Sequence, residues 1–138
     1  MKKLILVILT CMAITRSLAQ VFDREKTVRA YYSGFETHSW NTVAAQLAAN
    51  FTFTSPNNDN HISIEKFKEK CWPTNKFFKK INLVKMAESG NNVFLLVEIT
   101  TTDNQHVRNV DLFSFTSGKI SSIETYFGPG TWFPGNKK

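Results

Sequence analysis

The stretch Val110-Asp111-Leu112-Phe113-Ser114-Phe115 reads as a strand and carries one acid among apolar residues. Successive side chains of a strand point to opposite faces, so Asp111, Phe113 and Phe115 share a face. If that face points inward, the carboxyl is buried, its pKa rises and it stays a neutral hydrogen-bond donor at neutral pH. If the face points outward, Asp111 is a hydrated carboxylate. The two phenylalanines favour the inward orientation, which predicts a small-molecule site around Asp111.

Short turns join this stretch to its neighbours in the sequence. The turn-forming segments are Ser89 to Asn92, Asp103-Asn104 and Ser117-Gly118. Consecutive strands with short connections are typical of an antiparallel meander. The predicted strands cover residues 78–88, 93–101, 107–115 and 120–127.

Helical patterns dominate the part of the chain that precedes these strands. Residues 23–36 carry apolar side chains three to four positions apart, with Asp23 as the N-cap. A second helix begins at Ser39 and buries residues 40, 43, 44 and 47, and a third covers residues 63–71. Residues 50–55 alternate as a strand, and residues 56–60 form a polar loop. The sequence therefore predicts an α+β fold in which three N-terminal helices pack on a curved, mainly antiparallel sheet, forming a cone with an apolar pocket.

The N-terminal residues have the pattern of a secretory signal peptide. Lys2 and Lys3 precede an apolar stretch, residues 4–14, and Ser17-Leu18-Ala19 offers small residues for cleavage before Gln20. The apolar stretch is too short for a comfortable membrane span, so no stable membrane anchor is expected. The chain of 138 residues is then divided into a signal peptide (1–19), one domain (20–130) and a C-terminal tail (131–138), and is secreted or periplasmic.

Part of the positive charge belongs to this leader. The chain has 17 basic and 11 acidic residues, a net charge of +6, and loss of Lys2, Lys3 and Arg16 reduces it to +3. Aromatic residues interleave with lysines between residues 66 and 80, as in some nucleic-acid-binding proteins. A solvated helix face with an apolar underside explains this pattern better in an exported protein, so no nucleic-acid partner is expected.

The sequence contains no motif for a metal or a cofactor. It lacks His-x-His, Cys-x-x-Cys and a glycine-rich phosphate loop, and we expect neither kind of group. Cleavage before Gln20 leaves one cysteine, Cys71, which has no internal disulfide partner. Its position beside Trp72 favours a packed thiol over a nucleophile.

The order of elements resembles the nuclear transport factor 2-like superfamily, in particular its SnoaL-like polyketide cyclase and ketosteroid isomerase branches. The resemblance extends over roughly residues 21–128. Its clearest parts are Val28-Arg29-Ala30-Tyr31-Tyr32, residues 40–56, residues 110–115 with Gly118-Lys119-Ile120, and Tyr126-Phe127-Gly128. These motifs specify the fold better than the activity, because the fold hosts many functions.

The resemblance also implies roles for single residues. In the isomerases a tyrosine of the first helix and a strand aspartic acid donate hydrogen bonds to an enolate oxygen. An ungapped alignment places these residues at Tyr31 and Asp111. The position of the isomerase base, immediately before a proline, is occupied by Ser55, which is not basic enough to accept a proton from carbon.

Three functions are compatible with these residues. The first is a secreted protein that binds a hydrophobic ligand through a carbonyl or hydroxyl, without a complete catalytic set. The second is an isomerase, cyclase or hydratase that uses Asp111 as acid and base. The third is a scaffold with a vestigial pocket that dimerises through the outer face of its sheet, as the resemblance implies. The predicted pocket residues are Tyr31, Phe35, Trp40, Phe53, Ser55, Phe67, Asp111, Phe113 and Phe115.

Overall fold

The computed structural model describes residues 23–127. The predicted signal peptide, its cleavage site before Gln20 and the tail from residue 131 lie outside the described residues.

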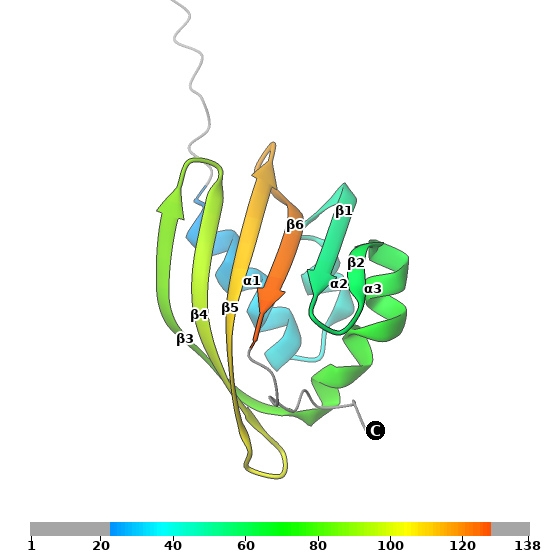
Figure 1. Ribbon diagram of the computed structural model, residues 1–138, viewed down its shortest axis with the longest axis vertical. Helices are drawn as coiled ribbons and strands as arrows, with labels where there is room; N and C mark the ends of the chain where they lie inside the picture. The colour runs from blue at the N-terminus through cyan, green and yellow to red at the C-terminus, as the bar shows by residue number, and fades with distance from the viewer. Residues whose placement is uncertain (1–22, 128–138) are drawn as a thin grey trace, which may run out of the picture.

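A curved six-stranded sheet forms one layer of the domain (Figure 1). Its strands are β1 (Leu47–Ser55), β2 (Asp59–Ser63), β3 (Phe78–Ser89), β4 (Asn92–Thr101), β5 (His106–Thr116) and β6 (Lys119–Tyr126). The strand order is β2-β1-β6-β5-β4-β3, so β2 and β3 are edges and the sheet is not closed. Strands β3 to β6 form the predicted antiparallel meander, whereas β1 pairs with β6 in parallel.

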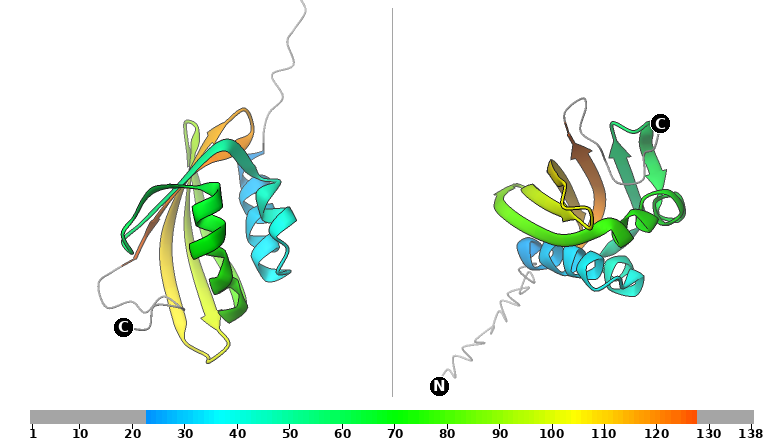
Figure 2. Two further views of the ribbon diagram at one scale, coloured as in Figure 1. Left: turned by 90° about the vertical axis from the view of Figure 1, so that its right-hand side faces the viewer. Right: turned by 90° about the horizontal axis from the view of Figure 1, so that it is seen from below.

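The helices form the second layer, on one face of the sheet (Figure 2). They are α1 (Arg24–Glu36), α2 (Trp40–Ala44), α3 (Ile64–Lys70) and the 3₁₀ helix η1 (Trp72–Phe77). Asp23 caps α1 as predicted, because its side chain accepts a hydrogen bond of 2.9 Å from the backbone N–H of Lys26. Ser39 and Ser63 cap α2 and α3 in the same way. The α+β architecture with a curved sheet under helices is confirmed.

A glycine lets α1 and α2 approach each other closely. A Cβ atom on Gly34 would lie 2.5 Å from Cγ2 of Val43 and 2.9 Å from its backbone nitrogen. Both distances are shorter than van der Waals contact, so a larger residue would push α2 away from α1. This contact sets the position of α1, which carries two tyrosines onto the sheet.

Two predicted boundaries are wrong. The second helix ends at Ala44, and Leu47 begins β1 instead of continuing the helical stripe. The predicted loop 56–60 is only partly a loop, because β2 begins at Asp59 and pairs with β1. In that hairpin Ser55 lies opposite Asp59.

The core lies between the helices and the inner face of the meander. Side chains of β4 and β5 alternate between buried and exposed positions. On β5 the inward set is Val107, Asn109, Asp111, Phe113 and Phe115. Asp111 therefore faces inward, as the two phenylalanines suggested.

Candidate functional site

A cavity of about 150 Å³ lies between the helical layer and the sheet. Both layers and the β1–β2 hairpin contribute to its wall, and apolar side chains outnumber polar ones. The lining residues are Tyr31, Tyr32, Phe35, Phe53, Ser55, Asn57, Asp59, Phe67, Lys70, Cys71, Thr74, Phe78, Ile99, Asn109, Asp111, Ile123, Thr125 and Phe127.

Asp111 is one of two buried acids of this wall, with an exposed fraction of 3%, and the other is Asp59. The hydroxyl of Tyr32 donates a hydrogen bond to Oδ2 of Asp111. Its Oδ1 is buried and has no hydrogen-bond partner within residues 23–127. A buried oxygen without a partner is costly, and a ligand that brings a donor removes this cost.

Burial raises the pKa of Asp111 from its ordinary value of 3.8 to about 6, and hydrogen bonding by the hydroxyls of Tyr32 and Thr125 limits the rise. At neutral pH the carboxylate form therefore predominates, by about ten to one at one pH unit above the pKa. This differs from the expectation of a neutral donor at neutral pH. The acid form predominates only below about pH 6, because the two hydroxyls stabilise the charged form.

The phenol that contacts Asp111 belongs to Tyr32, not to Tyr31. Tyr31 lines the same cavity, and its ring packs edge-on against the rings of Tyr32 and Phe113. Burial raises the pKa of both tyrosines well above 10, and the charge of the nearby Asp111 raises it further. Both tyrosines therefore remain protonated donors. The tyrosine that the alignment indicates, Tyr31, thus lies one residue before the tyrosine whose phenol makes the hydrogen bond to Asp111.

Asn109 is a lining residue that the sequence analysis did not identify. It lies on the inward face of β5, two residues before Asp111, and is 4% exposed. Its Oδ1, like that of Asp111, is buried without a partner in the described part of the chain. The period-two pattern of β5 places Asn109 on the same face as Asp111, which was the available signal.

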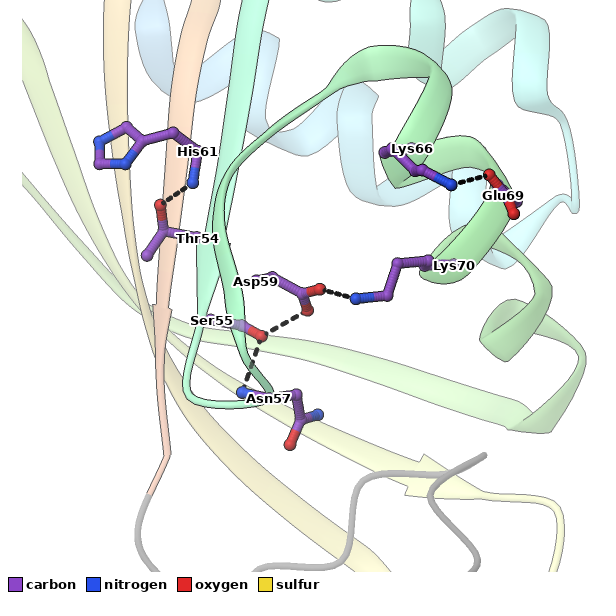
Figure 3. Close-up of polar contacts among 8 residues, drawn as sticks. All are labelled: Thr54, Ser55, Asn57, Asp59, His61, Lys66, Glu69 and Lys70. Atoms are coloured by element: carbon purple, nitrogen blue, oxygen red, sulfur yellow. Dashed lines mark hydrogen bonds and ion pairs between the residues drawn. The ribbon is translucent and has the colours of Figure 1, made fainter.

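A second polar group lies at the β1–β2 hairpin (Figure 3). Ser55 Oγ donates to Asp59 Oδ2 at 2.8 Å, and the ammonium group of Lys70 contacts Asp59 Oδ1. The backbone N–H of Asn57 donates to Ser55 Oγ at 3.2 Å. The hydrogen bond to Asp59 raises the pKa of Lys70. A carboxylate therefore lies next to Ser55, although the sequence position itself carries none.

The predicted aromatic wall is only partly the observed one. Phe35, Phe53 and Phe67 line the cavity. Trp40 instead packs against Phe67 and Trp72. The other two, Phe113 and Phe115, belong to the core around the cavity and not to its lining.

Cys71 lines the cavity as a protonated thiol. Burial raises its pKa to about 12, with a further contribution from Asp59. A thiolate nucleophile is therefore not available at neutral pH, in agreement with the packed thiol that the sequence favours. Among residues 23–127 no cluster of histidine, cysteine and acidic side chains could hold a metal ion. None of the helices in this range could cross a membrane.

Comparisons with known proteins agree with this architecture. The profile of the SnoaL-like domain family matches residues 28–123. No curated protein matches the chain. A nuclear transport factor 2-like protein of unknown function from Cytophaga hutchinsonii is 23% identical, with a TM-score of 0.67 over 81% of this chain and 96% of that one.

Two other similar structures are of proteins described more specifically. AclR, a putative hydroxylase from Streptomyces galilaeus, is 14% identical, with a TM-score of 0.66 over 78% of this chain and 76% of that one. A hypothetical protein with a ketosteroid isomerase-like fold from Catenulispora acidiphila, solved with trimethylamine, is 14% identical, with a TM-score of 0.63 over 77% and 88%. At these identities the likeness shows the fold alone.

Proposed function

The chain belongs to the SnoaL-like domain family, a branch of the nuclear transport factor 2-like superfamily, and on this premise we propose that it binds a small apolar molecule in the cavity beside Asp111. The polar group of the ligand is a hydrogen-bond donor such as a hydroxyl, because a carbonyl has no proton to offer the carboxylate of Asp111. The observation that carries the proposal is Oδ1 of Asp111, which lies in a largely apolar wall and has no partner among residues 23–127. Buried polar atoms of folded proteins are almost always hydrogen-bonded, so a ligand donor is the missing partner.

The size of the cavity limits the ligand. A volume of about 150 Å³ accommodates a molecule of about one six-membered ring, since engineered cavities of similar size hold benzene. Drug-sized ligands occupy pockets of roughly 300 Å³ or more. We therefore propose a one-ring ligand in place of a polycyclic one.

The test of this proposal uses cyclohexanol as a probe and follows the methyl NMR signals of Ile99 and Ile123, two lining residues. The double variant Tyr32→Phe with Asp111→Asn is expected to weaken binding by about 10- to 100-fold, because a hydrogen bond to a charged group contributes about 1.5 to 3 kcal/mol. The matched control carries Asp103→Asn, which removes an exposed acid outside the wall. Equal binding by both variants would contradict the proposal.

A second candidate function is acid–base catalysis by Asp111. Its pKa of about 6 lies near neutral pH, as the pKa of an effective general base does, and its Oδ1 has no hydrogen-bond partner among residues 23–127. An isomerase or cyclase of this kind would exchange the α-protons of an enolisable ketone. Deuterium uptake by cyclohexanone in D₂O, followed by NMR and lost in Asp111→Asn, would distinguish it from a binding protein without turnover.

We further propose that the protein is exported and that residues 1–19 are removed. The basic start, the apolar stretch and the small residues before Gln20 support this. Expression of the full chain in a bacterium is expected to give a processed form outside the cytoplasm whose intact mass corresponds to residues 20–138. Replacing Ala19 by a bulky residue (Ala19→Trp) should block processing. Recovery of only the full-length mass from the cytoplasm would contradict export.

The outer face of the sheet supports a proposal of homodimerisation. Leu96, Val110 and Tyr126 are exposed and lie opposite one another on β4, β5 and β6. Phe94 extends this apolar stripe along β4. Apolar side chains that are contiguous and exposed mark interaction surfaces more often than isolated ones do.

Val110→Lys, a change at the centre of the stripe, is expected to convert the dimer to a monomer. A lysine buried in the interface without a partner would weaken association by at least about 100-fold. Sedimentation velocity at several concentrations would measure this change. Ser89→Lys adds the same charge at the exposed end of β3 and should leave the dimer intact. A monomeric wild-type protein at high concentration would refute the proposed dimer.

A further inference from the structure

We infer that the ligand of the cavity is a small organic cation, an alkylammonium ion held beside Asp111. This inference rests on the proposed function and names the chemical class of its ligand. Three properties of the wall carry it, namely its unbalanced negative charge, its pair of acceptors without donors and its aromatic surface.

The first property is the charge of the wall. Asp59, Lys70 and Asp111 are the acidic and basic side chains that line the cavity within the described residues. Lys70 contacts Asp59, and the close-up in Figure 3 shows the two side chains meeting end to end. Asp111 forms no ion pair within residues 23–127, and its contacts there are with hydroxyl groups. With a pKa of about 6 it is charged at neutral pH, so the wall formed by the described residues carries one negative charge without a counter-ion. A buried charge of this kind is stabilised by a cation.

The second property is a shortage of hydrogen-bond donors. Oδ1 of Asp111 and Oδ1 of Asn109 are both buried, and neither has a partner in the part of the chain that the structure describes. The two residues lie two positions apart on the inward face of β5. Both atoms are acceptors and require donors from elsewhere. A hydroxyl supplies one donor, whereas a primary ammonium group supplies three. A primary alkylammonium ion therefore satisfies this pair better than an alcohol or a ketone does.

The third property is the aromatic surface. Seven of the eighteen lining residues are aromatic, among them Tyr31 and Tyr32 next to Asp111. The face of an aromatic ring attracts a cation, and the attraction increases when water is excluded. Aromatic walls around a buried carboxylate therefore suit a cation with an alkyl surface, and about 150 Å³ is enough for a four-carbon ion.

A matched pair of probes tests the class of ligand. The tert-butylammonium ion and tert-butyl alcohol have the same shape and differ in charge and in the number of donors. Titrated into the full chain at pH 7.5, the ammonium ion is expected to bind at least about tenfold more tightly than the alcohol, as judged from the methyl signals of Ile99 and Ile123. Asp111→Asn should abolish this preference, and Asp103→Asn, which removes an exposed acid outside the wall, should keep it.

The preference for the ammonium ion over the alcohol should also decrease when the pH falls from 7.5 to 5, because Asp111 takes up a proton in this range. The phenols of Tyr31 and Tyr32 and the thiol of Cys71 do not produce this change, because burial keeps them protonated throughout. Asp59, the other acid of the wall, forms an ion pair with Lys70. Binding of the alcohol as tightly as the ammonium ion would overturn this inference and leave the proposed binding function standing. Binding of neither probe, nor of cyclohexanol, would overturn both.

Discussion

The Asp111→Asn variant is expected to gain stability relative to the wild-type protein as the pH rises from 4 to 7.5. The gain should amount to about 2 to 3 kcal/mol, because a pKa raised from 3.8 to about 6 corresponds to about 2 units of 1.36 kcal/mol each. Asparagine keeps an oxygen that can accept the hydrogen bond of Tyr32 but has no charge to bury. The wild-type carboxylate, in contrast, carries its charge at a buried position.

The direction of this effect follows from proton linkage. Between pH 4 and pH 6 the folded wild-type protein keeps the proton of Asp111, whereas the unfolded chain has already lost it. The folded state thus binds more protons, so the free energy of unfolding falls as the pH rises. Above about pH 6 both states are ionised and the difference becomes constant. Asparagine does not titrate, so the variant lacks this fall.

Urea unfolding of both proteins at pH 4, 5, 6 and 7.5 measures the effect as a change in the difference between their free energies of unfolding. The difference between variants is the useful quantity, since other carboxyl groups contribute equally to both proteins. Glu36→Gln removes an exposed carboxylate at the end of α1 and serves as the control. A difference between Asp111→Asn and wild type that stays constant over this pH range would show that Asp111 is not desolvated.

The meander was predictable because its strands follow a simple rule. The burial of β4 and β5 alternates with period two, as their sequences do, and each strand pairs with the next through a short turn. Such local pairing needs no information beyond the neighbouring segment. The inward orientation of Asp111 came from the same alternation.

The strand β2 was not predictable from its residues. Asp59 and Asn60, the first two residues of β2, have low strand propensity, and most of β2 is exposed at the edge of the sheet. Its pairing with β1 overrides this propensity. The contact between Ser55 and Asp59 was not predictable for the same reason, because the two residues lie side by side only when the hairpin forms.

The choice between the two tyrosines also needed coordinates. Tyr31 and Tyr32 are adjacent on α1, and both are buried. A helix rotates by about 100° per residue, so a stripe of apolar positions can include both neighbours. Which hydroxyl meets Asp111 depends on the rotation of α1 over the sheet, and the close contact of Gly34 with Val43 helps to set the position of that helix. Spacing along the sequence does not contain this information.

Phe113→Ala is expected to destabilise the protein by about 3 to 5 kcal/mol, as large-to-small changes of buried aromatic residues do. Phe113 is completely buried, and its ring packs edge-on against the rings of both Tyr31 and Tyr32. Truncation leaves a hole behind the two phenols and removes the surface that holds them over Asp111. The sequence predicts Phe113 in the ligand wall. Its observed position in the core implies instead that it supports the two tyrosines.

A comparison of Phe113 with Phe53, which lines the cavity, distinguishes a residue that supports the site from one that contacts the ligand. Phe53→Leu changes a residue of the cavity wall and keeps most of its apolar volume, so it should alter the affinity for cyclohexanol more than the stability. The matched change Phe113→Leu should do the opposite and lower the free energy of unfolding by more than Phe53→Leu does. Urea unfolding and the NMR titration, applied to both leucine variants, give the two quantities side by side. If Phe113→Leu changed only the affinity, the ring would belong to the ligand site, and the hydrogen bond between Tyr32 and Asp111 would not depend on the packing behind it.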